Sequence, residues 1–161
     1  MVIASSAPPR HARLTGGAAL ARTLRAAGVR SVYGVPAGKL APFLRAVGED
    51  AALTHVAVRH EAAAAWMATA IFHATGELAV AYGESGPGSH NLVSALGSAR
   101  ANGLAVLVVT SGAPTYAAYP HEGLVMDVDN GALFAGATKA SLVARDAARV
   151  PALVHRALRA A

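Results

Sequence analysis

The sequence contains no cysteine among its 161 residues. This absence excludes disulfide bonds, thiolate metal sites and cysteine nucleophiles, and it fits the cytoplasmic protein that we expect. The sequence also lacks any run of about 20 uninterrupted apolar residues, which a membrane helix needs, so we expect no membrane partner. Residues 1–14 contain no apolar run long enough for a signal peptide, and their proline, serine and alanine content predicts a flexible N-terminal arm.

Aromatic and acidic residues are both scarce. Phenylalanine, tryptophan and tyrosine together make up 5% of the chain, and 9 acidic residues face 14 lysines and arginines, which gives a net charge of +5. A nucleic-acid-binding surface usually clusters basic residues with aromatic residues between them, whereas here the arginines are scattered. We therefore interpret the charge as a solvated surface and expect no nucleic-acid partner.

Helix-like and strand-like segments alternate along the rest of the chain, as judged from apolar spacing. The expected helices are 15–29, 38–48, 60–75, 86–103 and 147–161, and the expected strands are 31–36, 53–58, 78–83, 104–112 and 137–144. Thr15 is expected as an N-cap, and Gly28 and Gly76 as helix ends. The run 104–112 is continuously β-rich, as expected of a strand covered on both faces.

This alternation predicts a parallel sheet with helices on both faces. We expect the α/β fold class, with residues 15–161 forming a single three-layer domain of flavodoxin-like type. In such sheets ligands lie beyond the carboxyl ends of the strands. The segments expected at that edge are 34–39, 83–91 and 110–123.

Glu61 opens the expected helix 60–75 at this edge, and two interpretations stay open. An acid in the first helical turn is favoured by about 0.3–1 kcal/mol because unpaired N–H groups point there. The helix that follows is apolar on all faces, however, so its mouth is expected to be enclosed, and an enclosed carboxylate needs a partner. Such a carboxyl can share a proton with a ligand nitrogen.

The turn GPGSHN, residues 86–91, is equally open to two interpretations. Glycines at a helix start let backbone N–H groups approach a phosphate, but the segment lacks the lysine of a P-loop and the full dinucleotide glycine pattern. The alternative is a tight strand-to-helix turn. The histidines show no pair at metal-ligand spacing with a third ligand, so we expect no metal site made by this chain alone.

Four stretches in this order resemble the pyrimidine-binding, N-terminal domain of thiamine-diphosphate-dependent enzymes of the acetolactate synthase and 2-oxo acid decarboxylase group. They are GVRSVYGVPAG, VRHEAAAAWMA, HATGELAVAYGESGPGSHNLVSALGSARANGLAVLVVTSG and MDVDNGALFAGATKASLV. Together they cover about residues 15–160. The resemblance implies that Glu61 shares a proton with N1′ of the cofactor's aminopyrimidine ring and favours its imino form.

The resemblance also assigns the remaining candidate residues. It implies catalytic roles for Glu61 and Glu84, cofactor contacts from Glu61, Pro36, Gly86, Pro87 and Asn91, and a substrate pocket that includes Gly38 and His121. Glu84 matches a substrate-facing histidine of the benzoylformate decarboxylase branch, so we expect a second titrating group there; the alternative is a surface acid at a strand end.

Several positions depart from the family pattern. Ala62 stands where the family usually has glutamine, and TAIFH, residues 69–73, replaces the usual Asp-Gly-Tyr-Ala-Arg. Ala37-Gly38 replaces the double glycine after the proline, and Glu84 replaces the threonine before Ser85. These departures concern the substrate class and the normal activity rather than the fold.

No stretch matches the family's second domain, which binds the diphosphate through magnesium and carries Gly-Asp-Gly, or its middle domain, the seat of the flavin in some relatives. We expect a split enzyme: this chain would need a separate partner chain that binds most of the thiamine diphosphate and magnesium, in a self-associating heterotetramer. The reaction would be decarboxylation of a 2-oxo acid, with protonation or ligation of the acyl anion. Alternatives are a noncatalytic subunit, a fragment of a longer enzyme, and an unrelated nucleotide-binding domain.

Overall fold

A computed structural model describes residues 14–114, 116–117, 124 and 126–161. The expected arm lies outside these residues except for Leu14, and so does His121. The elements in chain order are α1 (Gly16–Ala26), β1 (Ser31–Gly34), the 3-10 turn η1 (Gly38–Leu40), α2 (Ala41–Gly48), β2 (Thr54–Ala57), α3 (Glu61–Thr75), β3 (Val80–Gly83), α4 (Pro87–Ala101), β4 (Leu107–Thr110), α5 (Asn130–Ala135), the 3-10 turn η2 (Ala147–Arg149) and α6 (Val150–Ala160).

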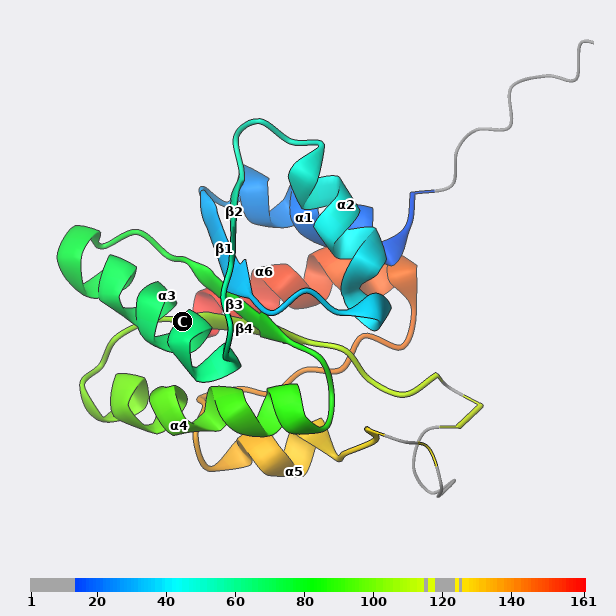
Figure 1. Cartoon of the computed structure of the whole chain (residues 1–161). Coiled ribbons are helices and arrows are strands. Elements are labelled where there is room, and N and C mark those ends of the chain that lie inside the picture. The colour runs from blue at the N-terminus through cyan, green and yellow to red at the C-terminus, as the bar shows by residue number, and fades with distance from the viewer. Residues whose placement is uncertain (1–13, 115, 118–123, 125) are drawn as a thin grey trace, which may run out of the picture.

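The four strands form one parallel sheet in the order β2-β1-β3-β4. Helices α1, α2 and α6 cover one face and α3, α4 and α5 cover the other, as Figure 1 shows. Each face has its own core, one centred on Leu24, Val32 and Phe43 and the other on the alanines of α3 and on Leu92. The predicted three-layer α/β fold is therefore confirmed.

Local signals place the helix ends as predicted. The Thr15 side chain accepts a hydrogen bond from the N–H of Ala18 at 3.1 Å, which caps α1. Helix α3 ends at Gly76 in the left-handed region (φ 73°), where a residue without a Cβ is unstrained. Pro42 and Pro87 lie in the first turns of α2 and α4, where a missing N–H is tolerated.

The predicted strand over 137–144 is wrong, because this segment runs beside β4 without pairing to it. The guanidinium of Arg100 donates hydrogen bonds to the carbonyls of Gly136 (3.0 Å) and Thr138 (2.9 Å) and holds the start of the segment against α4. The short helix α5, which Asp129 caps through the N–H of Ala132, is not among the helices expected from the sequence.

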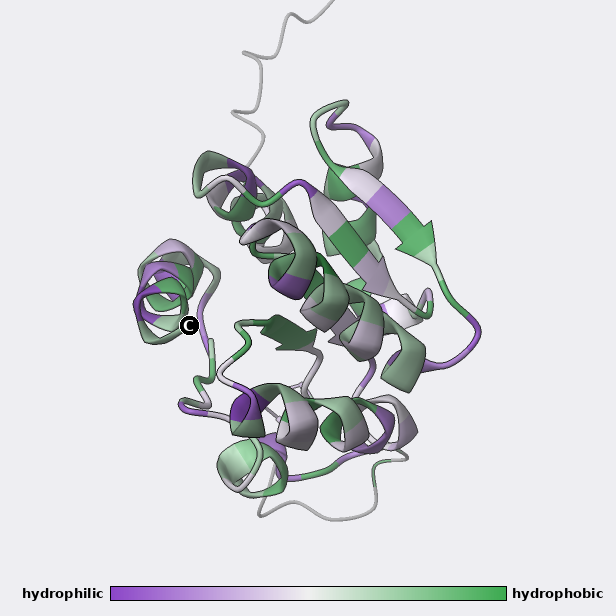
Figure 2. Ribbon diagram, turned by 90° about the vertical axis from the view of Figure 1, so that its left-hand side faces the viewer, coloured by the Kyte–Doolittle hydropathy of each residue, from purple (hydrophilic) through white to green (hydrophobic). Residues whose placement is uncertain are grey.

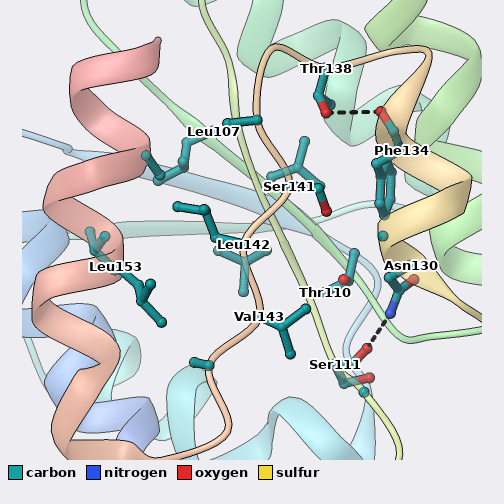
Figure 3. A pocket seen from close by; sticks show the side chains of 18 of the residues that line it. Leu107, Thr110, Ser111, Asn130, Phe134, Thr138, Ser141, Leu142, Val143 and Leu153 are labelled. Atoms are coloured by element: carbon teal, nitrogen blue, oxygen red, sulfur yellow. Dashed lines mark hydrogen bonds between the residues drawn. The ribbon is translucent and has the colours of Figure 1, made fainter. Parts of the chain in front are cut away.

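A cavity of about 820 Å³ lies along β4, between the 139–145 segment, α5 and α6. Figure 3 shows Leu142 and Val143 from this segment, Leu153 from α6 and Leu107 from β4 around it. β4 is an edge strand of the sheet, and all of its residues are half-buried. Leu107 and Val109 nevertheless pack against one core and Val108 against the other, as expected of a strand covered on both faces.

Tyr82 fixes the spacing at the centre of the sheet. Its side chain is fully buried, and its ring lies so close to β1 that a Cβ on Gly34 would come within 2.5 Å of it. The Tyr82 hydroxyl hydrogen-bonds Nε2 of His55, on β2, at 2.7 Å. Burial, together with the negative charge of Glu61, raises the pKa of Tyr82 to about 12, so Glu61 lies near enough for its charge to reach this ring.

This packing predicts opposite effects for two glycine-to-alanine substitutions. Gly34→Ala forces a methyl group against the Tyr82 ring and its backbone carbonyl, so it should lower the free energy of unfolding by about 2 kcal/mol or more. Gly97→Ala, in the middle of α4 with nothing within 4 Å of its Cβ position, should raise it by about 0.5–1 kcal/mol. Urea unfolding of both variants checks this; equal stability of the two would contradict the packing described.

Candidate functional site

Glu61 is the first residue of α3 and follows the carboxyl end of β2 after a three-residue connection. The side chain of the preceding residue, His60, caps the helix, because its Nδ1 accepts the N–H of Ala62 at 3.2 Å. The glutamate therefore does not serve as the N-cap. Glu61 is half-buried, and its side chain lies against the turn that joins β3 to α4.

Two glycines and an asparagine define the position of the Glu61 carboxyl. A Cβ on Gly83 would lie 3.1 Å from Glu61 Cγ, and a Cβ on Gly88 would lie 3.0 Å from Glu61 Oε1. The amide of Asn91, in α4, donates a hydrogen bond to Glu61 Oε2 at 2.9 Å. The absence of side chains at these two glycines therefore makes room for the carboxyl, and Asn91 fixes its orientation.

The other carboxyl oxygen, Oε1, accepts no hydrogen bond from the residues that the structure describes. It is also not one of the buried side-chain atoms without a partner. Oε1 therefore keeps an open side and is available to a ligand. A carboxyl with one oxygen fixed and one open suits proton sharing with a ring nitrogen.

The turn from Gly83 to Gly88 is a tight strand-to-helix connection. Gly86, the N-cap of α4, has a φ of 84°, and a Cβ there would lie 2.9 Å from the Cα of Met126. The N–H of Ser85 is bonded to Ser111 Oγ at 3.0 Å, and the N–H of Ser89 to the carbonyl of Glu84 at 2.9 Å. Both N–H groups are thus already bonded within the protein. The geometry therefore favours a structural turn over a phosphate-binding turn.

Glu84 lies on the same turn, next to Gly83, which contacts Glu61. Its side chain is half-buried and makes no hydrogen bond to another described residue. Its position agrees with an acid facing the same edge as Glu61. A titrating role for Glu84 stays a prediction.

The β1–α2 connection, which contains Pro36 and Gly38, lies beside this turn. Nζ of Lys39 lies 3.4 Å from Oγ of Ser85 and so joins the two segments. The Ser85 hydroxyl in turn donates to the carbonyl of Met126 at 2.6 Å. Sequence reasoning missed Lys39 and Ser85 as site residues; the only available signal was their location at the expected ligand edge.

Asn130 extends this network towards the cavity. Its amide nitrogen donates to the carbonyl of Ser111 at 3.0 Å, as Figure 3 shows, while its buried Oδ1 has no partner. Within the described ranges, no group of three or more histidine or acidic side chains could hold a metal ion. The described helices are all too short or too polar to cross a membrane.

Comparison with protein-family models identifies the family of this domain. Residues 14–133 match the thiamine pyrophosphate enzyme, N-terminal TPP binding domain. The match covers most of the chain, including the Glu61 helix and the turn at Gly83–Gly88. The chain belongs to this family.

The relatives are of the acetolactate synthase type. The chain is 38% identical to an acetolactate synthase of Mycobacterium avium over 98 residues, 61% of this chain and 16% of that protein. It is 30% identical to a glyoxylate carboligase of Escherichia coli O157:H7 over 131 residues (81% and 22%) and 28% identical to the acetolactate synthase isozyme 1 large subunit of Escherichia coli K12 over 149 residues (92% and 26%). The chain thus spans a quarter or less of the length of most of these relatives.

The Glu61–Asn91 contact predicts a pH-dependent effect of substitution at residue 91. Asn91→Ala should lower the free energy of unfolding by about 1–2 kcal/mol through loss of one hydrogen bond. At pH 7, Asn91→Asp should lower the free energy of unfolding by more than Asn91→Ala does, because it places two carboxylates in contact. This difference between the two variants should become smaller near pH 4, as one of the carboxylates takes up a proton. Urea unfolding at both pH values checks this. If the two variants are equally stable at pH 7, or if their difference does not change with pH, residues 61 and 91 are not in contact.

Proposed function

We propose that this domain holds the aminopyrimidine half of thiamine diphosphate through Glu61, in an enzyme that decarboxylates a 2-oxo acid and then protonates or ligates the acyl product. The observation that carries the proposal is the Glu61 carboxyl, with Oε2 fixed by Asn91 and Oε1 open beside two glycines. Membership of the family supports the choice of cofactor. The acetolactate synthases and the carboligase among the relatives support the reaction type.

When bound, thiamine diphosphate supplies the carbon nucleophile and the electron sink. The described residues then have two tasks, to exchange a proton with the cofactor ring and to hold the carboxyl in place. Glu61 Oε1 holds or releases a proton at ring nitrogen N1′, and Asn91 keeps the carboxyl in the orientation that this exchange requires. Gly83 and Gly88 leave room for the carboxyl at the sheet edge, where a ring can approach it.

Several further groups complete the proposed site. Pro36, Gly86 and Pro87 would contact the cofactor, and Gly38, Glu84 and His121 would face the substrate. The diphosphate and magnesium would be bound by a second domain, on a partner chain or on a further part of a longer chain. The share of the relatives that this chain covers, 16–26%, is compatible with either arrangement. We favour a partner chain and a heterotetramer with two copies of each subunit.

The role of Glu61 predicts a large and specific loss of activity. In the assembled enzyme, Glu61→Gln keeps the shape of the side chain but cannot share a proton, so turnover of a 2-oxo acid should fall about 10²–10⁴-fold. Glu77→Gln, which neutralises an exposed acid just beyond the other end of α3, is the matched control and should retain the parent rate.

If Glu61→Gln turns over at the parent rate, Glu61 is only an acid at a helix mouth, and a noncatalytic role for the chain gains support. Circular dichroism and co-purification with the second domain establish that any loss of rate does not come from misfolding or failed assembly.

The outer face of α3 predicts self-association. Trp66 and Met67 are 48% and 38% exposed, although the helix is apolar, and Figure 2 shows little hydrophilic colour along it. The apolar sequence of this helix predicts that Trp66, Met67, Ile71 and Phe72 are all exposed. That prediction is wrong for Ile71, which packs against the second core and is half-buried, and for Phe72, which is also half-buried. We propose that Trp66 and Met67 contact a second copy of this chain in the assembled enzyme.

Replacing both Trp66 and Met67 by lysine should therefore shift the isolated chain towards monomer in light scattering, with little change in its unfolding free energy, because both side chains are already exposed. Val143→Lys, at a 63% exposed apolar residue outside α3, is the control and should leave the association unchanged. A parent chain that remains monomeric at high concentration would contradict this proposal.

A further inference from the structure

Lys39 is a cation placed at the carboxyl edge of the sheet. It lies in η1, directly after the β1 connection, and it is exposed. Its Nζ is 3.4 Å from Ser85 Oγ, a long and therefore weak contact. Because the Ser85 hydroxyl already donates to the carbonyl of Met126, its oxygen can only accept from Lys39. The ammonium group keeps its remaining donors for another partner.

No acidic side chain neutralises Lys39 within the described part of the chain. The ion pair found there joins Arg25 to Asp50 at 3.2 Å, on a different part of the surface. Glu84, the neighbour of Ser85, does not pair with Lys39 either. The charge of Lys39 is therefore available to an anionic ligand that reaches this edge.

Lys39 and Glu61 approach the same short turn from two different connections. Lys39 contacts Ser85 from the β1–α2 connection, and Glu61 contacts Gly83 and Gly88 from the β2–α3 connection. Gly83 and Ser85 are two residues apart, which spans at most about 7 Å of chain. The cation and the carboxyl that we assign to the cofactor thus contact the same turn at neighbouring positions.

We propose that Lys39 binds a second anionic group on the substrate, so that the enzyme selects 2-oxo acids that carry a distal acidic group over those with a plain alkyl chain. The inference rests on the proposed function of the site. It adds the substrate class, which the choice of cofactor leaves open.

The chemistry of decarboxylation favours a distal group over the reacting carboxylate as the partner of Lys39. The reacting carboxylate leaves as carbon dioxide and loses its charge, and the electron pair of the broken C–C bond stays on the former carbonyl carbon. A cation paired with that carboxylate would stabilise the substrate more than the transition state and would slow the reaction. A distal anion keeps its charge throughout, so pairing with it gives selectivity without this penalty.

The test compares two substrates of equal chain length, 2-oxoglutarate and 2-oxopentanoate, in the assembled enzyme. The readout is the ratio of their kcat/KM values. Lys39→Met should lower the ratio about tenfold, as expected for one charge-assisted hydrogen bond, mainly because the dicarboxylate binds more weakly. Lys39→Arg keeps the positive charge and should retain most of the parent's kcat/KM ratio. Lys139→Met removes the other lysine of the chain, which bonds the carbonyl of Ala161, and should leave the ratio unchanged.

An unchanged ratio in Lys39→Met, or an equal loss in Lys139→Met, overturns the inference. If the parent enzyme turns over no 2-oxo acid, the proposed function has failed, and saturation-transfer NMR of the same two compounds tests Lys39 separately. Preferential binding of 2-oxoglutarate that Lys39→Met abolishes then supports an anion site at Lys39. Binding of neither compound, or of both equally, overturns it.

Discussion

The hydrogen bond from Asn91 to Glu61 is the contact on which the rest of the site depends. It joins the start of α3 to the first turns of α4 and holds a carboxyl over a turn that has no side chain at Gly83 or Gly88. A carboxylate in a partly buried position is stable only when its hydrogen-bonding capacity is met. Here the protein binds one oxygen and leaves the other open, and this arrangement supports the proposed ligand site.

The neighbouring turn supports this arrangement through contacts from distant parts of the chain. Ser111, after β4, accepts the N–H of Ser85, and Met126 lies so close to Gly86 that a Cβ there would have to displace it. Lys39 reaches the same turn from the connection between β1 and α2. Four connections therefore meet at one edge of the sheet, as expected where parallel strands end. The edge is closely packed on the Glu61 side and more open along β4, where the cavity lies.

Much of this fold could be predicted from the sequence because its signals are local. Thr15 and Gly76 specify helix ends by their own chemistry, and the alternation of strands and helices specifies a parallel sheet. The strand predicted over 137–144 did not form; the start of this segment is held instead by Arg100, a contact between residues far apart in the sequence that the local pattern does not indicate. The contact of Lys39 with Ser85 joins residues 46 apart, and no periodicity or cap could have indicated it. The position of Glu61 was predicted, but the asparagine that orients it was assigned to the cofactor through resemblance alone.

The central claim is that this domain supplies the pyrimidine side of a cofactor site whose diphosphate side lies on another domain. Calorimetric titration with thiamine diphosphate and magnesium tests it most directly, first on this chain alone and then on the chain together with a diphosphate-binding domain. Because that second domain would provide most of the charge-assisted hydrogen bonds to the cofactor, the account predicts weak or undetectable binding to the chain alone and clear binding to the assembly. Micromolar affinity of the isolated chain would contradict it.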